Sequence, residues 1–338
     1  TLNWLDDKRD KNKPFMMMYL HKAPHRPWWP SPEKFAEFTQ KTFPEPVTLF
    51  DDYSNRGTAA KTAEMNLLTH MMYSHDSKIR PETLEAMGEV SPAVEEYPNG
   101  FYGPYNRANE AQKALYDPIL DSINEDFRAR WPEMNDTEKM RWKYQRYMQD
   151  YLATISSVDD NVGRVLDYLD QNGLTENTIV VYTSDQGFYL GEHGWFDKRF
   201  IYDESFKTPL LIRWPNKIEP GTTNEEMVQN LDFAQTFLEA AGINAPADMQ
   251  GESLMPLLTG QDSLWTRDTL DSQRTGNALR ADGAGNTDRT LWPGHALEAL
   301  DTLRPGNALR ARGAGSADGT LWTGHTLDAL GTLRAGGS

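Results

Sequence analysis

Apolar residues recur at helical spacing between residues 148 and 169, and this stretch carries the clearest pattern in the sequence. On a helix of about 3.6 residues per turn they form one stripe: Met148, Tyr151, Leu152, Ile155, Val158, Val162, Val165, Leu166 and Leu169. Gly173 follows as a stop signal, so the pattern predicts an amphipathic helix. Asp159 falls inside the stripe and Asp160 falls outside it. We therefore expect Asp159 to be buried and to accept hydrogen bonds.

Three short apolar runs are typical of buried strands. They are the Met-rich run at 14–20 and the two runs at 178–183 and 209–214. Leu231 to Ala241 predicts a further helix, which ends at Gly242. Strands and helices in this order favour an α/β fold in which helices cover a parallel sheet.

The character of the sequence changes after residue 262. Residues 276–305 and 306–335 form a tandem repeat, in which Gly-Asn-Ala-Leu-Arg at 276–280 recurs at 306–310. Two copies are too few to bury a solenoid core, and Gly, Asp and Arg interrupt every apolar run. We therefore divide the chain into a globular part, 1–262, and a low-complexity tail, 263–338, which we expect to be disordered. His295 and His325 repeat with the tail and are not candidate site residues.

The composition excludes several classes of protein. The net charge of −16 argues against nucleic acid as a partner, because no basic stripe is available to meet phosphates. The 338 residues include no Cys, which excludes disulfides, thiolate metal sites and a cysteine nucleophile within them. No run reaches about 18 apolar residues, so we expect no membrane span. Residues 1–4 show neither Met nor a signal-peptide pattern, so we expect the chain to start inside a longer protein.

The strongest chemical signal follows the strand predicted at 178–183. Residues 183–198 read Thr-Ser-Asp-Gln-Gly-Phe-Tyr-Leu-Gly-Glu-His-Gly-Trp-Phe-Asp-Lys. Asp185 and Gln186 lie just beyond the strand, where open parallel sheets bind ligands, and their oxygens suit Ca²⁺ or Mg²⁺. Lys198 could return to the same site and neutralise an anion. On these residues alone, an ordinary turn at the end of a strand remains the alternative.

This segment resembles the second signature region of the type I sulfatases, the formylglycine-dependent family with the alkaline-phosphatase-like fold. The similarity covers about residues 11–262, including Gln250-Gly251-Glu252-Ser253-Leu254 and the loop His21-Lys22-Ala23-Pro24-His25. Residues 185–199 most resemble bacterial enzymes that act on 6-sulfated N-acetylglucosamine. The resemblance implies an α/β three-layer sandwich with a mostly parallel central sheet, incomplete at its N-terminus, and the activity of a sulfuric ester hydrolase on sulfated carbohydrate.

The family's functional residues map onto named positions of this chain. Asp185 and Gln186 match two ligands of a single Ca²⁺. Lys198 matches the lysine that holds the sulfate and steadies the leaving oxygen. His25 matches the histidine beside the scissile ester oxygen, and an imidazole is suited to protonate a leaving alcohol near neutral pH. His193 is a further candidate for contact with the substrate.

Several other residues in these loops have weaker signals. Trp28 and Trp29 could stack on a sugar ring, but an aromatic pair next to Pro is more often packing. Lys22 could simply mark the loop. Glu192 and Asp197 could orient the residues that hold the ligand.

The chain also departs from the family pattern. The family's nucleophile is a formylglycine made from Cys or Ser in a Cys/Ser-x-Pro-x-Arg motif, and no such motif occurs here. Two upstream Asp ligands of the metal are absent as well. We therefore expect the chain to be inactive alone. A non-catalytic fragment or misread open reading frame is one alternative, and a phosphatase or phosphodiesterase of the same superfamily is another, although those enzymes generally use two metals.

The resemblance also implies partners and a location. We expect a sulfated sugar, or a fragment of a glycosaminoglycan or mucin, as the substrate. Relatives are usually periplasmic or secreted, and the same is expected here.

Overall fold

The computed structural model describes residues 1–90, 100–261 and 265 of the chain. The chain divides into two compact units, Thr1–Asn216 and Lys217–Ser338. The predicted boundary at 262/263 and the repeats of the tail lie outside the described residues, so both stay predictions.

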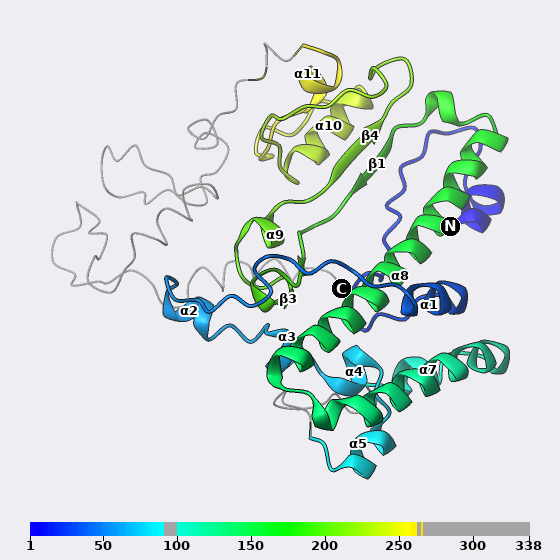
Figure 1. Cartoon of the computed structure of the whole chain (residues 1–338). Helices are drawn as coiled ribbons and strands as arrows, with labels where there is room; N and C mark the ends of the chain where they lie inside the picture. The colour runs from blue at the N-terminus through cyan, green and yellow to red at the C-terminus, as the bar shows by residue number, and fades with distance from the viewer. Residues whose placement is uncertain (91–99, 262–264, 266–338) are drawn as a thin grey trace. The chain divides into compact units, whose positions relative to one another are not determined.

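Among its described residues the first unit is mainly helical, with two short strand pairs (Figure 1). Its elements are the π-helix η1 (Trp4–Lys8), α1 (Pro32–Thr39), α2 (Thr58–Lys61), α3 (Leu67–His70), α4 (Tyr73–Ser77), α5 (Pro81–Met87), α6 (Tyr102–Tyr105), α7 (Glu110–Arg130), η2 (Trp131–Glu133), α8 (Asp136–Gln171), η3 (Thr175–Asn177), β1 (Val180–Thr183), β2 (Tyr189–Leu190), η4 (Glu192–Gly194), β3 (Phe196–Asp197), α9 (Asp203–Phe206) and β4 (Leu210–Arg213).

Capping residues set the start of the two long helices. Asn109 begins α7, and its side chain accepts from the backbone N–H of Gln112, whose side chain in turn accepts from the Asn109 N–H. Asn135 and Glu138 form the same reciprocal pair at the start of α8. Gly173, in the left-handed conformation at φ +63°, follows the end of α8. The helix predicted from residue 148 is therefore confirmed, and it begins twelve residues earlier, at Asp136.

Helix α8 packs against α1, α3 and α4, and α1 also packs against α7 (Figure 1). An aromatic cluster fills the space around α1, α5 and α7: Phe35, Tyr73, Ile79, Leu84, Phe101, Tyr116, Leu120, Ile123, Phe127, Trp131 and Trp142. A second cluster lies along α8: Trp28, Leu49, Leu67, Met71, Met140, Tyr144, Tyr147, Met148, Tyr151 and Phe196. Burial of these large side chains is the main term that stabilises the helical layer.

The prediction for Asp159 is wrong, because this residue is exposed. In the C-terminal half of α8 the stripe residues Val162, Val165 and Leu166 are only half-buried, so the covered face is narrower there than the sequence pattern suggests. The buried carboxylate of α8 is Asp150, which pairs with Lys78 at 2.6 Å and with Arg146.

The α/β class is confirmed, and the strands add detail. The predicted strands at 178–183 and 209–214 form β1 and β4, which pair antiparallel, with Val180 opposite Arg213 and Thr183 opposite Leu210. The pair β2–β3 is also antiparallel. Between β1 and β4 the chain forms β2, η4, β3 and the four-residue helix α9, and no long crossover helix of the kind that usually joins parallel strands. The parallel arrangement expected for the sheet is therefore not found among the described strands.

The strand expected at residues 14–20 is not formed. Met16, Met18 and Leu20 are 68%, 69% and 78% exposed, while the residues between them are half-buried. The prediction of a strand buried on both faces is therefore wrong. Alternate side chains of the segment are exposed and half-buried, and no described strand pairs with it.

The second unit contains α10 (Asp232–Ala240) and α11 (Met255–Leu258) among its described residues. The predicted helix at 231–241 is confirmed as α10, and Gly242 follows it at φ +71°. The buried Asp232 carboxylate accepts from the backbone N–H groups of Gln229 and Glu252 at 2.7 and 2.9 Å. A Cβ on Gly251 would lie 2.3 Å from the carbonyl oxygen of Leu231, so only glycine permits this close approach.

Candidate active site

Strand β1 leads directly into the pair of oxygen donors. Asp185 is exposed and Gln186 is half-buried, two and three residues beyond the end of β1. The next residue, Gly187, donates its N–H to the carbonyl of Ser205 at 2.9 Å. A Cβ at Gly187 would lie 2.2 Å from the carbonyl oxygen of Glu204. Glycine is therefore required here, because the backbone after Gln186 lies directly against α9.

The following loop rests on α8. Strands β2 and β3 pair Tyr189 with Asp197, and the Tyr147 hydroxyl on α8 donates to the Tyr189 carbonyl at 2.6 Å. Gly191 has φ +102°, and the ring of Tyr144 occupies the space where its Cβ would lie. The loop geometry is therefore fixed by side chains of α8 rather than by the short strands alone.

His193 is held by polar groups from a distant segment. Its Nδ1 lies 2.7 Å from Asp51 Oδ2, and its Nε2 lies 3.9 Å from Glu204 Oε1. Its backbone N–H donates to Thr48 Oγ1 at 3.0 Å, and its carbonyl accepts from the Tyr53 hydroxyl at 2.5 Å. The ring is buried, so these contacts give His193 a role in fixing the loop.

The Asp51 carboxyl that holds His193 has a lowered pKa. Burial by itself raises the pKa of Asp51, and the hydrogen bond with His193, the backbone N–H of Tyr53 and the charge of Arg56 together outweigh that effect. The carboxyl is thus ionised near neutral pH and is a strong acceptor for the imidazole.

Lys198 follows β3 and is half-buried. Its carbonyl accepts from the Ser205 hydroxyl at 2.8 Å, which fixes its backbone. The neighbouring buried carboxylate, Asp197, is paired with Arg199. In the described part of the chain no carboxylate pairs with the Lys198 ammonium group, so its charge is available to an anion.

Contacts on both sides of His25 fix the loop that carries it, while His25 itself is exposed. Arg26 pairs with the buried Asp76, and the Trp28 indole N–H donates to the Pro24 carbonyl at 2.8 Å. His25 Nδ1 lies 2.8 Å from the Arg26 carbonyl oxygen. A carbonyl only accepts, so Nδ1 carries a proton. Nε2 is left to exchange a proton with a bound molecule.

Two tyrosines of α8 bring the three predicted segments together. Trp28, near His25, packs on Tyr147 with ring centroids 4.8 Å apart. Phe188, near Gln186, stacks on Tyr151 at 5.2 Å. Phe196, near Lys198, meets the Tyr147 ring at 6.5 Å.

A cation–π contact adds to this arrangement, because the Arg26 guanidinium lies 5.1 Å from the centroid of the Phe196 ring. The His25 loop and the segment before Lys198 are therefore neighbours. Sequence reasoning placed Tyr151 in the apolar stripe without seeing this role. The spacing of Tyr144, Tyr147 and Tyr151 on one helical face was the available signal.

The side-chain oxygens of Asp185 and Gln186 suit a hard cation, but they are too few to complete its set of ligands. Ca²⁺ takes about six to eight oxygen ligands, and two adjacent side chains supply only part of such a set. Across residues 1–90, 100–261 and 265, no three His, Cys, Asp or Glu side chains are close enough to hold a metal ion together. These two residues are therefore partial ligands at most.

Comparisons with known proteins identify relatives of this chain. Residues 191–271 match the family model described as N-sulphoglucosamine sulphohydrolase, C-terminal. The chain is 44% identical over 261 residues to an N-acetylglucosamine-6-O-sulfatase of Bacteroides thetaiotaomicron, covering 77% of this chain and 45% of that protein. It is 39% identical over 164 residues to the Homo sapiens N-acetylglucosamine-6-sulfatase, covering 48% of this chain and 26% of the relative.

A solved structure is similar as well. That protein, in complex with its substrate D-glucosamine-2-N,6-O-disulfate, matches with a TM-score of 0.68 and 44% identity. The match covers 76% of this chain and 50% of the other. The chain thus spans about half the length of these two matches.

Proposed function

Since this chain belongs to the sulfatase family, we propose that the complete protein hydrolyses a sulfate ester of a carbohydrate, and that this chain supplies the leaving-group side of the site. The observation that carries the proposal is the packing of three segments on Tyr147 and Tyr151 of α8. Those segments carry His25, Asp185 with Gln186, and Lys198, which are the residues that the family pattern assigns to the site.

His25 is the proposed general acid. Its Nδ1 proton is engaged by the Arg26 carbonyl, so proton exchange takes place at Nε2. A departing sugar alkoxide needs a proton, and an imidazolium supplies it near neutral pH. Lys198 binds the anionic sulfate and offsets the negative charge that develops on the leaving oxygen. His193 is proposed to position the loop that follows Gln186, through its contact with Asp51. In this proposal it does not touch the substrate directly.

Asp185 and Gln186 are proposed to hold part of a Ca²⁺ ion, together with ligands from outside this pair. The ion would supply a positive charge that polarises the sulfate. The family's formylglycine nucleophile is expected outside these 338 residues, which contain no Cys. Within this chain, the residues therefore bind the anion, hold the metal loop and deliver a proton.

The proposed substrate is 6-sulfated N-acetylglucosamine, free or at the end of a glycosaminoglycan or mucin fragment. Support comes from the 44% identity to an N-acetylglucosamine-6-O-sulfatase and from the matched structure, which holds a glucosamine disulfate. Substrates of this kind are extracellular polymers, so a periplasmic or secreted location is proposed with it. In the part of the chain that the structure covers, no helix is both long and apolar enough to cross a membrane.

The test is sulfate release by the complete protein, purified with Ca²⁺. N-acetylglucosamine 6-sulfate should be hydrolysed faster than an aryl sulfate or a 2-sulfated uronate. His25→Ala should lower kcat by about 10²–10⁴-fold, the usual worth of general acid catalysis. Lys61→Ala, which removes an exposed cation on α2, is the matched control and should leave kcat unchanged. Preference for the 2-sulfated uronate would overturn the substrate assignment.

A further inference from the structure

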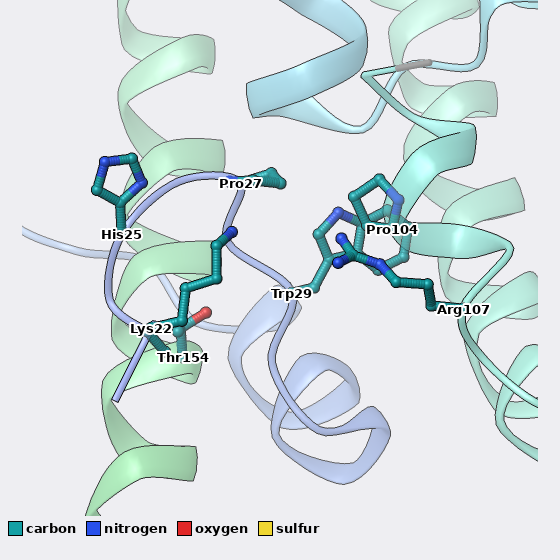
Figure 2. A pocket seen from close by; sticks show the side chains of 8 residues that line it. Lys22, His25, Pro27, Trp29, Pro104, Arg107 and Thr154 are labelled. Carbon is teal, nitrogen blue, oxygen red and sulfur yellow. The ribbon is translucent and has the colours of Figure 1, made fainter. Parts of the chain in front are cut away.

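A cavity of about 230 Å³ lies between the His25 loop and the segment around α6 (Figure 2). Lys22, Ala23, His25, Pro27, Trp29, Pro104, Arg107 and Thr154 line it. Pockets for drug-sized ligands measure about 300–1,000 Å³, so this one has room for a single sugar ring or one of its substituents. It borders His25, the proposed general acid, and none of its lining residues is Asp185, Gln186 or Lys198.

Two cations stand at the rim of this cavity. Figure 2 shows the side chains of Lys22 and Arg107 extending toward each other from opposite walls. Both residues are exposed. Within the described ranges neither side chain has a carboxylate partner, in contrast to Arg26 and Arg80, which pair with Asp76 and Asp121. Two cations without counter-charges across a small cavity attract an anion.

Trp29, which lines the cavity, carries a donor without an acceptor. The Nε1 of Trp29 is buried and has no hydrogen-bond partner among the described residues, whereas the Nε1 of Trp28 donates to Pro24. A buried N–H without a partner is unfavourable, so an acceptor atom bound beside it would be stabilised. The ring is held by Phe101 at 5.8 Å and Tyr116 at 5.6 Å, so this donor has a fixed direction.

The remaining wall suits a sugar. Pro27, Pro104 and the ring of Trp29 present apolar surface, against which the C–H face of a pyranose packs. The hydroxyl of the buried Thr154 donates to the Asp150 carbonyl at 2.8 Å, so its oxygen can accept from a sugar hydroxyl. A ligand that fits this cavity has an anionic group, an acceptor atom for Trp29 and an apolar ring face. An anionic sugar has all three.

We propose that this cavity binds a second anionic substituent of the substrate, a sulfate or carboxylate distinct from the sulfate ester that is cleaved, through Lys22, Arg107 and the indole N–H of Trp29. This inference rests on the proposed function, since it places a sugar chain beside His25. It makes the preferred substrate a sugar with at least two anionic groups.

The experiment follows the indole N–H signal of Trp29 by NMR, in the complete protein, with the signal assigned by its loss in Trp29→Phe. The probes are glucosamine 2-N-sulfate, glucuronate, glucosamine 2-N,6-O-disulfate and neutral N-acetylglucosamine. The anionic sugars should shift the signal and the neutral sugar should not. Whether the sulfate or the carboxylate binds at lower concentration identifies the substituent that this cavity holds.

The double variant Lys22→Ala, Arg107→Ala should weaken binding of the disulfate by about tenfold or more, the effect of losing charged hydrogen bonds. Lys61→Ala, Arg164→Ala removes two exposed cations outside the cavity and is the matched control, with no change expected. Circular dichroism establishes that both doubles are folded.

The outcomes separate this inference from the proposed function. Disulfate binding that neither shifts the Trp29 signal nor depends on Lys22 and Arg107 overturns the inference and leaves the proposed function standing. A shift by glucosamine 2-N-sulfate, without any release of sulfate from 6-sulfated sugars by the complete protein, supports the anion site and overturns the proposed function. No binding of any anionic sugar overturns the inference.

Discussion

The helical and strand sides of the first unit differ in how far their side chains are buried and paired. Around α1, α7 and α8, large apolar residues are buried and the buried charges are paired, as Asp150 is with Lys78. On the strand side, β1 and β4 are four residues long, Leu211 is 65% exposed, and Asp185 is exposed.

The difference separates stability from chemistry. The helical layer satisfies its own apolar and charged groups, so it serves as a scaffold that holds the loops. The candidate site lies on loops at the less covered side, which is where ligand-binding groups are usually found. Changes in the helical layer should therefore affect folding, and changes in the loops should affect binding and turnover.

The largest expected effect is that the 338-residue chain alone has no sulfatase activity. It contains no Cys and no Ser in a Ser-x-Pro-x-Arg context, so it lacks the nucleophile that the proposed function requires. General acid assistance from His25 is worth only about 10²–10⁴-fold, which is far below the acceleration of about 10⁶-fold or more that enzymes reach. Sulfate release from N-acetylglucosamine 6-sulfate with Ca²⁺ should equal that of His25→Ala. Turnover above this variant would show that the strand side holds a nucleophile.

The next effect concerns the buried charges of the helical layer. Asp150→Ala leaves Lys78 buried without its partner, and Lys78 and Asp150 side chains are both fully buried. Removing one member of a buried pair costs about 3–5 kcal/mol, so the free energy of unfolding should fall by this amount in urea titrations. Asp160→Ala removes an exposed carboxylate that pairs with Lys34 at 3.3 Å, and should cost about 1 kcal/mol or less. Equal losses in the two variants would remove the contrast between the regions.

The sequence predicted the C-terminal part of α8 because its signals are local, whereas α1 and α7 were not predicted. The apolar stripe and Gly173 act within a few residues along the chain. A candidate site just beyond the end of a strand could also be predicted at Asp185, because that prediction depends only on a strand followed by a motif. Asp159 was misplaced because a helical wheel gives the direction of a side chain and not the extent of the surface that covers it.

Long-range contacts could not be predicted from the sequence in the same way. The pairing of Asp51 with His193 joins residues 142 positions apart, and Arg26 with Asp76 joins residues 50 apart. Nothing in the local pattern of Asp51 or Asp76 distinguishes it from a solvated carboxylate. The cavity at Arg107 has the same origin, because the chain brings that residue to the His25 loop only through tertiary packing.

A smaller effect should appear when the pH is lowered. Burial by itself raises the pKa of Asp76, but the hydrogen bond from His75 and the charge of Arg26 outweigh it, so the pKa lies below its ordinary value of 3.8. A lowered folded-state pKa gives stability that is present above the unfolded value and is lost as pH falls through the folded value. The free energy of unfolding should therefore fall as the pH drops below about 4, and Asp76→Asn should reduce that fall. The control is Asp159→Asn at an exposed position of α8. A pH dependence that is the same in both variants would contradict the role of Asp76.

The smallest expected effect tests the strand side directly. Leu211 on β4 is 65% exposed, whereas Leu120 on α7 is fully buried. Leu120→Ala should lower the free energy of unfolding by about 2–5 kcal/mol, because it removes buried methyl groups and leaves a cavity. Leu211→Ala removes the same atoms from a position already in contact with water, so its cost should lie within about 0.5 kcal/mol. Urea titration of the two variants measures both values under one condition. A cost at Leu211 close to that at Leu120 would mean that the outer face of β4 is covered in solution, and the difference between the two regions would then be one of composition and not of burial.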